Sequence, residues 1–217
     1  MTSGRRSDRG QAFPIYMVAI AGLLFAALAF FVVGRAAITR SDAQGAADAA
    51  ALAAGRESRD AVLDNLDLAA LTPADWEKIV DGGLLRRDKA CVAAEAFAAK
   101  NEGRVTLCDP ASPRFTISVE TNATVGDSVV PDTGSRHGTA TATALVQPKC
   151  SLAAAPSPAP TPSPSPTAPA ESASPAPLPS PSMVAFSCGG ELVKLDPLKP
   201  GSLDALTRRL FSVRLVG

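Results

Sequence analysis

A long uncharged apolar run near the start of the chain dominates its pattern of hydrophobic and polar positions. Residues 12–34, AFPIYMVAIAGLLFAALAFFVVG, contain no charged side chain. A helix that crosses a bilayer needs roughly 20 apolar residues, whereas the apolar run of a cleaved signal peptide usually has about 7–15. The pattern therefore predicts one transmembrane helix over residues 12–34, preceded by a polar arm of residues 1–11.

Alanine-rich sequence continues the helical pattern beyond the apolar run. Residues 35–57 consist largely of good helix formers, so we expect the helix to extend outside the membrane. Four alanines recur at three- and four-residue steps, which places their methyl groups on one face: Ala43, Ala47, Ala50 and Ala54. We interpret this face as a helix-packing surface that contacts a partner subunit. The alternative is that it packs only on the chain's own domain.

Short helices and alternating strands are predicted for residues 58–150. Thr72, followed by a proline and then by a carboxylate at the third position, is typical of a helix N-terminus, and residues 88–102 have a helical pattern. Residues 115–119 alternate apolar and polar side chains, and residues 139–147 alternate likewise, which is typical of strands with one buried face. We expect an antiparallel meander, so 58–150 is interpreted as one exported α+β domain.

The rest of the chain is divided by a tract rich in Pro, Ser and Ala. Residues 151–182 cannot build a core, and we expect them to form a disordered, solvated loop. Residues 183–195 then predict a hairpin, Ser202 a helix cap, and residues 210–216 a strand. Because so short a segment is too small to fold alone, we expect residues 183–217 to dock on the meander.

Four cysteines are present: Cys91, Cys108, Cys150 and Cys188. The even number, without a CxxC pair, favours disulfides in an oxidising compartment over a metal site. A helix that returns beside its own strand would bring Cys91 to Cys108, and Cys150 with Cys188 would then close the Pro-rich tract. Four cysteines allow three pairings, and the other two pairings stay open.

The topology is inferred from arginines and cysteines together. Three arginines precede the apolar run, and Arg35 and Arg40 follow it, so the bias that keeps basic residues in the cytoplasm is modest here. The cysteines place the bulk of the chain outside. We therefore expect a single-pass cell-membrane protein in contact with membrane lipid, with a cytoplasmic N-terminus and an extracellular C-terminal domain.

Composition and motifs limit the functions that the chain can have. The 217 residues carry a net charge of zero, so the basic excess of a protein that binds nucleic acid is missing. The one histidine, His137, would have to form the centre of any Ser-His-Asp site. The sequence has no phosphate-binding glycine loop, HExxH helix or metal-spaced His/Cys cluster. We expect no enzyme activity, no cofactor, no metal and no small-molecule substrate.

Three features in this order resemble a known family: the Arg9-Gly10 step, the uncharged run, and DAQGAADAAALAAG at residues 42–55. Together they resemble the TadG-like N-terminal segment of Tad/Flp pilus-assembly proteins, which are related to the TadE-like minor pilins. The resemblance implies a membrane-anchored structural or assembly component of a pilus or related secretion system, with other such subunits as partners. Pilin-like cleavage after Gly10 would put Ile15 where a glutamate is usual, so we expect an uncleaved anchor.

The expected fold class is α+β, with a long transmembrane helix that continues outside the membrane, short helices, an antiparallel β-sheet and a disordered Pro-rich loop. Two other functions are considered. One is a membrane-anchored extracellular binding or sensing domain unrelated to pili, and a weaker one is an exported hydrolase.

Overall fold

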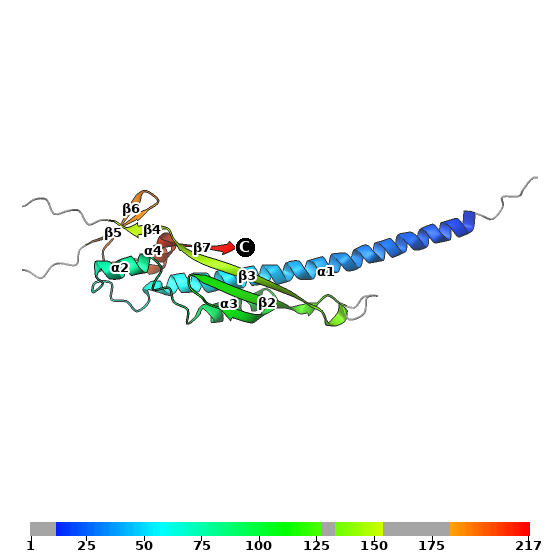
Figure 1. Ribbon diagram of the computed structural model, residues 1–217, viewed down its shortest axis with the longest axis horizontal. Coiled ribbons are helices and arrows are strands. Elements are labelled where there is room, and N and C mark those ends of the chain that lie inside the picture. Colours follow the sequence, from blue (N-terminus) through cyan, green and yellow to red (C-terminus); the bar gives the residue numbers. More distant parts are fainter. Residues whose placement is uncertain (1–11, 127–132, 154–182) are drawn as a thin grey trace, which may run out of the picture.

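One helix forms the long axis of the molecule. The computed structural model describes residues 12–126, 133–153 and 183–217, and the predicted N-terminal arm lies outside them. Helix α1 (Ala12–Asp60) is unbroken over 49 residues, which corresponds to about 70 Å at 1.5 Å per residue. Its first half stands alone, while its second half is covered by the rest of the chain (Figure 1). The predicted continuation of the helix is confirmed and ends at Asp60.

A four-stranded antiparallel sheet packs on the second half of α1. The strand order is β1-β2-β3-β7, and the strands are β1 (Gly103–Asp109), β2 (Arg114–Thr124), β3 (His137–Pro148) and β7 (Phe211–Val216). The alternation seen in the sequence decides which face is buried, because Phe115, Ile117 and Val119 of β2 are fully buried. The predicted meander is therefore present, and the C-terminal strand β7 extends it by pairing with β3.

A second, three-stranded sheet forms at the end of the molecule away from the free half of α1 (Figure 1). It contains β4 (Cys150–Leu152), β5 (Val184–Cys188) and β6 (Glu191–Leu195), in that order. This corrects the expectation that the β5–β6 hairpin joins the meander. The hairpin pairs instead with β4, so Ser151 and Leu152 belong to a strand and not to the Pro-rich loop. The remainder of that loop, residues 154–182, lies outside the described residues.

Short helices connect these layers, and their ends follow local sequence rules. They are α2 (Pro73–Val80), α3 (Ala90–Lys100) and α4 (Leu203–Leu210), with single 3₁₀ turns at Ala61–Leu63 and Thr133–Ser135. Thr72 caps α2 by accepting a hydrogen bond from the Asp75 amide, and the Asp75 carboxylate accepts one from the Thr72 amide. Hydrogen bonds from Thr72 lower the pKa of the Asp75 carboxyl. Ser202 caps α4.

The core lies between α1, the four-stranded sheet and the short helices. Its largest buried side chains are Trp76, Phe115, Phe186 and Phe211. Trp76 of α2 meets Phe186 of β5 edge to face, with 5.7 Å between the ring centroids. This contact joins the second sheet to the core, so the single tryptophan has a packing role.

Two glycines let the sheet approach α1 more closely than a side chain would allow. A Cβ atom on Gly138 of β3 would overlap the Thr39 carbonyl oxygen of α1. A Cβ on Gly103 of β1 would lie 2.6 Å from Cγ1 of Val119 and 3.2 Å from Cβ of Ala46. The strands therefore rest on the helix backbone at Thr39 and on the methyl group of Ala46.

Gly138→Ala should lower the free energy of unfolding by roughly 1–3 kcal/mol, the usual cost of overpacking a filled contact. The clash partner is backbone, which cannot rotate away. Gly45→Ala is the matched control, since nothing lies within 4 Å of its added Cβ, and it should stabilise α1 by up to about 1 kcal/mol. Thermal unfolding of both full-length variants in detergent measures the difference. Equal melting temperatures would contradict the close approach.

Candidate functional site

The free half of α1 exposes a continuous apolar surface. Among the described residues, α1 is the one helix that is long and apolar enough to cross a membrane. None of its most hydrophobic 18-residue stretch is buried by protein. Phe30, for example, is 83% exposed. Large apolar side chains exposed on all sides over this length of helix need a nonaqueous environment. The structure therefore supports a membrane span here.

The covered half of α1 packs through its small side chains. We call the alanine seam the set of α1 alanines that are at most 1% exposed: Ala43, Ala46, Ala47, Ala50, Ala51 and Ala54. These residues lie against the chain's own β2, β3 and α3. The expectation that Ala43, Ala47, Ala50 and Ala54 form a contact surface for a partner subunit is therefore wrong. A methyl face identifies a packing surface, but its periodicity does not identify what covers it.

A β-hairpin runs along α1 back toward the membrane span (Figure 1). Its strands are β2 and β3, and Gly138 near the start of β3 rests on Thr39 of α1. Farther along, a Cβ placed on Gly126 would lie 3.5 Å from Nη2 of Arg35. Arg35 is the first residue after the uncharged run, so the described tip of the hairpin lies level with the end of the span.

His137 helps to hold this hairpin together. Its Nδ1 lies 2.7 Å from the Thr121 carbonyl oxygen, and because a carbonyl only accepts, Nδ1 donates. Thr121 also accepts a hydrogen bond from the Gly138 amide at 2.9 Å and donates one to the Ala123 carbonyl at 2.7 Å. These bonds connect the end of β2 to the start of β3. His137, the one candidate catalytic residue, thus makes a structural hydrogen bond that joins β2 to β3 near the tip of the hairpin.

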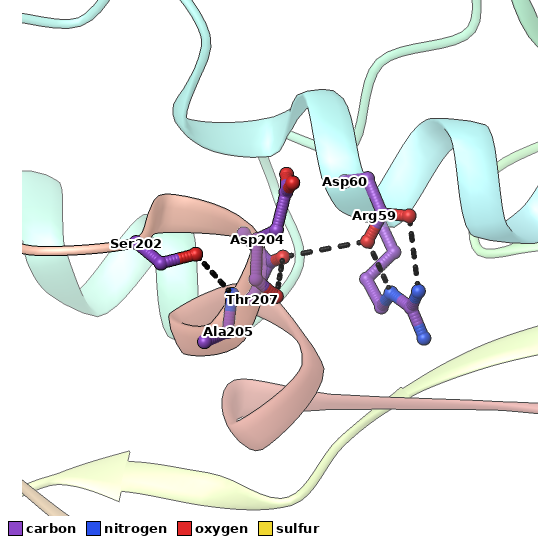
Figure 2. Close-up of polar contacts among 6 residues, drawn as sticks. All are labelled: Arg59, Asp60, Ser202, Asp204, Ala205 and Thr207. Carbon is purple, nitrogen blue, oxygen red and sulfur yellow. Dashed lines mark hydrogen bonds and ion pairs between the residues drawn. The ribbon is translucent and has the colours of Figure 1, made fainter.

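A polar cluster lies where the C-terminal segment meets the far end of α1 (Figure 2). The Arg59 guanidinium binds both carboxylate oxygens of Asp60, at 2.8 and 3.0 Å. Thr207 of α4 is fully buried, and its hydroxyl lies 3.4 Å from Oδ1 of Asp60 and 3.1 Å from the Asp204 carbonyl oxygen. Sequence reasoning missed this cluster, because Asp60 and Thr207 are 147 residues apart and neither belongs to a recognisable motif.

Two disulfides cross-link the domain. Cys91 of α3 is bonded to Cys108 of β1, and Cys150 of β4 is bonded to Cys188 of β5. The second bond joins the two strands that flank the Pro-rich tract in sequence. It therefore holds the last part of the chain next to the meander, where β7 pairs with β3.

Two open hollows on the described surface are lined by charged side chains. One, of about 400 Å³, lies between α1, the end of α3 and the end of β2, and its lining includes Asp42, Lys100 and Glu102. The other lies beside the Cys150–Cys188 disulfide, with Lys149 and Arg209 in its lining. Across the described residues there is no group of three or more His, Cys, Asp or Glu side chains that could hold a metal ion.

Comparison with known proteins places one segment of the chain. Residues 10–57 match the family model described as putative Flp pilus-assembly TadE/G-like. The match covers the apolar span and the alanine seam, which confirms the resemblance expected from the sequence. No curated protein and no solved structure matches the chain.

Ala50→Glu should unfold the domain, because it buries an unpaired charge in the alanine seam at a position with 0% exposure. The expected loss is several kcal/mol. Ser41→Glu adds the same charge at an exposed position of the same helix and should change stability by less than about 0.5 kcal/mol. Thermal unfolding and protease resistance measure both. A stable Ala50→Glu protein would contradict burial of the seam.

A protease site inserted within residues 165–170 tests the link across the Pro-rich tract. After cleavage, we expect the two fragments to migrate as one species on a non-reducing denaturing gel and to separate after reduction, because Cys150 is bonded to Cys188. In the uncut Cys150→Ser/Cys188→Ser variant, loss of the 38-residue loop closure should cost about 4 kcal/mol of stability. Separation without reductant would contradict the disulfide.

Proposed function

We propose that this chain, whose residues 10–57 match the Tad pilus-assembly family, is a structural component of a Tad/Flp-type pilus or related secretion system. It acts through a single membrane anchor and is not an enzyme. The observation that carries the proposal is the unbroken course of α1, in which the family segment supplies both the apolar span and the buried spine of the folded domain.

This arrangement suits an assembly subunit because one continuous helix, α1, forms both the membrane anchor and the spine of the domain. Helix α1 has no break between the exposed span and the alanine seam. The domain packs closely against it at Thr39 and Ala46. The direction in which the helix leaves the bilayer therefore fixes the direction of the domain. Subunits placed side by side in a membrane can then present their domains in one orientation.

The proposed topology keeps the N-terminus in the cytoplasm and places the domain outside the cell membrane. Two disulfides support this orientation, since disulfides persist in oxidising compartments. In this arrangement residues 12–34 lie in the bilayer, and residues 35–57 continue the same helix as the spine of the domain. Residues 58–150 and 183–217 pack on that spine and complete the domain. The anchor is proposed to remain uncleaved, with other pilus or secretion subunits and membrane lipid as its partners.

Deletion of the gene in cells that carry a Tad-type export ATPase and membrane platform tests the function. We expect surface pili or secretion to be lost, and tagged protein to co-purify with platform components from solubilised membranes. Full-length protein and Gly45→Ala should restore assembly, because both keep the span and the fold. Ala50→Glu should not restore it, since the span persists without the packed domain.

Membrane anchoring is measured separately by extraction of membranes with alkaline carbonate, which an anchored protein resists. If the protein is anchored but deletion leaves pili and secretion unchanged, and no platform component co-purifies, the assembly function is wrong. A membrane-anchored binding or sensing domain would then describe the chain better.

A further inference from the structure

Two separate parts of the chain bring arginines to the place where α1 leaves its apolar span. Arg35 and Arg40 lie on α1, and Arg136 lies where the hairpin returns, immediately before β3. The Val125 amide donates to the Arg136 carbonyl at 2.8 Å, and the next residue, Gly126, lies beside Arg35. Arg35 and Arg136 therefore occupy the same level along the helix. We call Arg35, Arg40 and Arg136 the boundary arginines.

The boundary arginines are exposed and have no carboxylate partner in the described part of the chain. All three are solvent-exposed, and the ion pairs between described residues involve other basic groups. Farther from the span, Arg59, Arg86 and Arg104 each pair with an acidic side chain, whereas the exposed Arg208 and Arg209 of α4 have no such pair among the described residues. The boundary arginines are therefore distinguished by their position beside the span. The sequence also has Asp127 and Asp132, which lie outside the described residues.

We propose that the boundary arginines bind the phosphate groups of anionic phospholipids. Each leaflet has a polar layer about 5–8 Å thick outside the hydrocarbon. Arg35 and Arg40 lie within about 9 Å of Gly34 along the helix, at 1.5 Å per residue, so their guanidinium groups reach this layer. Guanidinium donors match phosphate oxygens. Ile38, which is 58% exposed between them, adds an apolar side chain at the same interface.

Arg136 extends the proposed lipid site from α1 to the folded domain. Arg136 belongs to the folded domain and is held at the boundary by the Gly138–Thr39 contact and the His137–Thr121 hydrogen bond. Headgroups bound by Arg35 and Arg136 together therefore attach the domain to the membrane at a second point beside the helix. Tilting of α1 and its domain relative to the bilayer surface is restricted as a result.

The inference rests on the membrane anchoring proposed above and not on the pilus function. Carbonate extraction tests that anchoring independently, so the two proposals can fail separately. The site test uses the full-length protein in neutral detergent, with native mass spectrometry to count bound lipids. Phosphatidylglycerol and phosphatidylcholine with identical acyl chains are the two probes, because both carry a phosphate but only the first has a net negative charge.

We expect phosphatidylglycerol to bind more tightly than phosphatidylcholine, and Arg35→Gln/Arg136→Gln to weaken the binding of phosphatidylglycerol about fivefold per arginine removed. Arg35→Lys/Arg136→Lys should retain most of the affinity. The matched control is Arg208→Gln/Arg209→Gln, which removes the same charge from exposed positions on α4, beside the far end of α1. It should bind phosphatidylglycerol like the unmodified protein.

Equal phosphatidylglycerol affinity in the boundary and α4 variants would overturn the proposal, as would equal binding of the two lipids. Displacement of the lipid by inorganic phosphate at constant ionic strength would overturn it in favour of a small-anion site. Binding of an acidic peptide that is lost in Arg35→Gln/Arg136→Gln, with phosphatidylglycerol binding unchanged, would overturn it in favour of a protein partner.

Discussion

The packing of alanine methyl groups on α1 against the inner face of the four-stranded sheet is the contact on which the structure depends. Side chains this small bring the strands close to the helix backbone, and Gly103 and Gly138 bring them closer at two points. Such contacts are individually weak, and they act collectively because no space is left between the surfaces. Larger residues at these positions would separate α1 from the sheet that it supports.

That contact makes one helix serve two environments. The same α1 that exposes phenylalanine and leucine to a bilayer buries alanine under a sheet, without a break between the two halves. The domain is then completed from a distance, because β7 pairs with β3, the Cys150–Cys188 disulfide holds the second sheet, and Thr207 reaches Asp60 at the end of α1. The membrane span and the last strand of the chain thereby belong to one rigid assembly.

The hairpin of β2 and β3 is a second part of the structure that lies close to the end of the membrane span. It follows α1 back to Arg35, so part of the sheet lies at the level where the apolar run ends. Because the domain packs tightly on α1, the hairpin beside the helix gives this rigid assembly a defined side toward the bilayer surface. A defined orientation of this kind is what the proposed assembly function requires.

The sequence by itself determined the elements whose signals are local. Residues 12–34 predict a span by length and lack of charge, Thr72 and Ser202 mark helix starts through their own hydroxyls, and residues 115–119 show a buried strand face by alternation. Only the tertiary structure decided what covers the alanine seam, because a methyl carries no information about its partner. It also decided that the β5–β6 hairpin pairs with β4, a strand of three residues, in a second sheet and not with the meander. The contact between Thr207 and Asp60 likewise appears only in the tertiary structure. These are contacts between distant parts of the chain, and no local propensity encodes them.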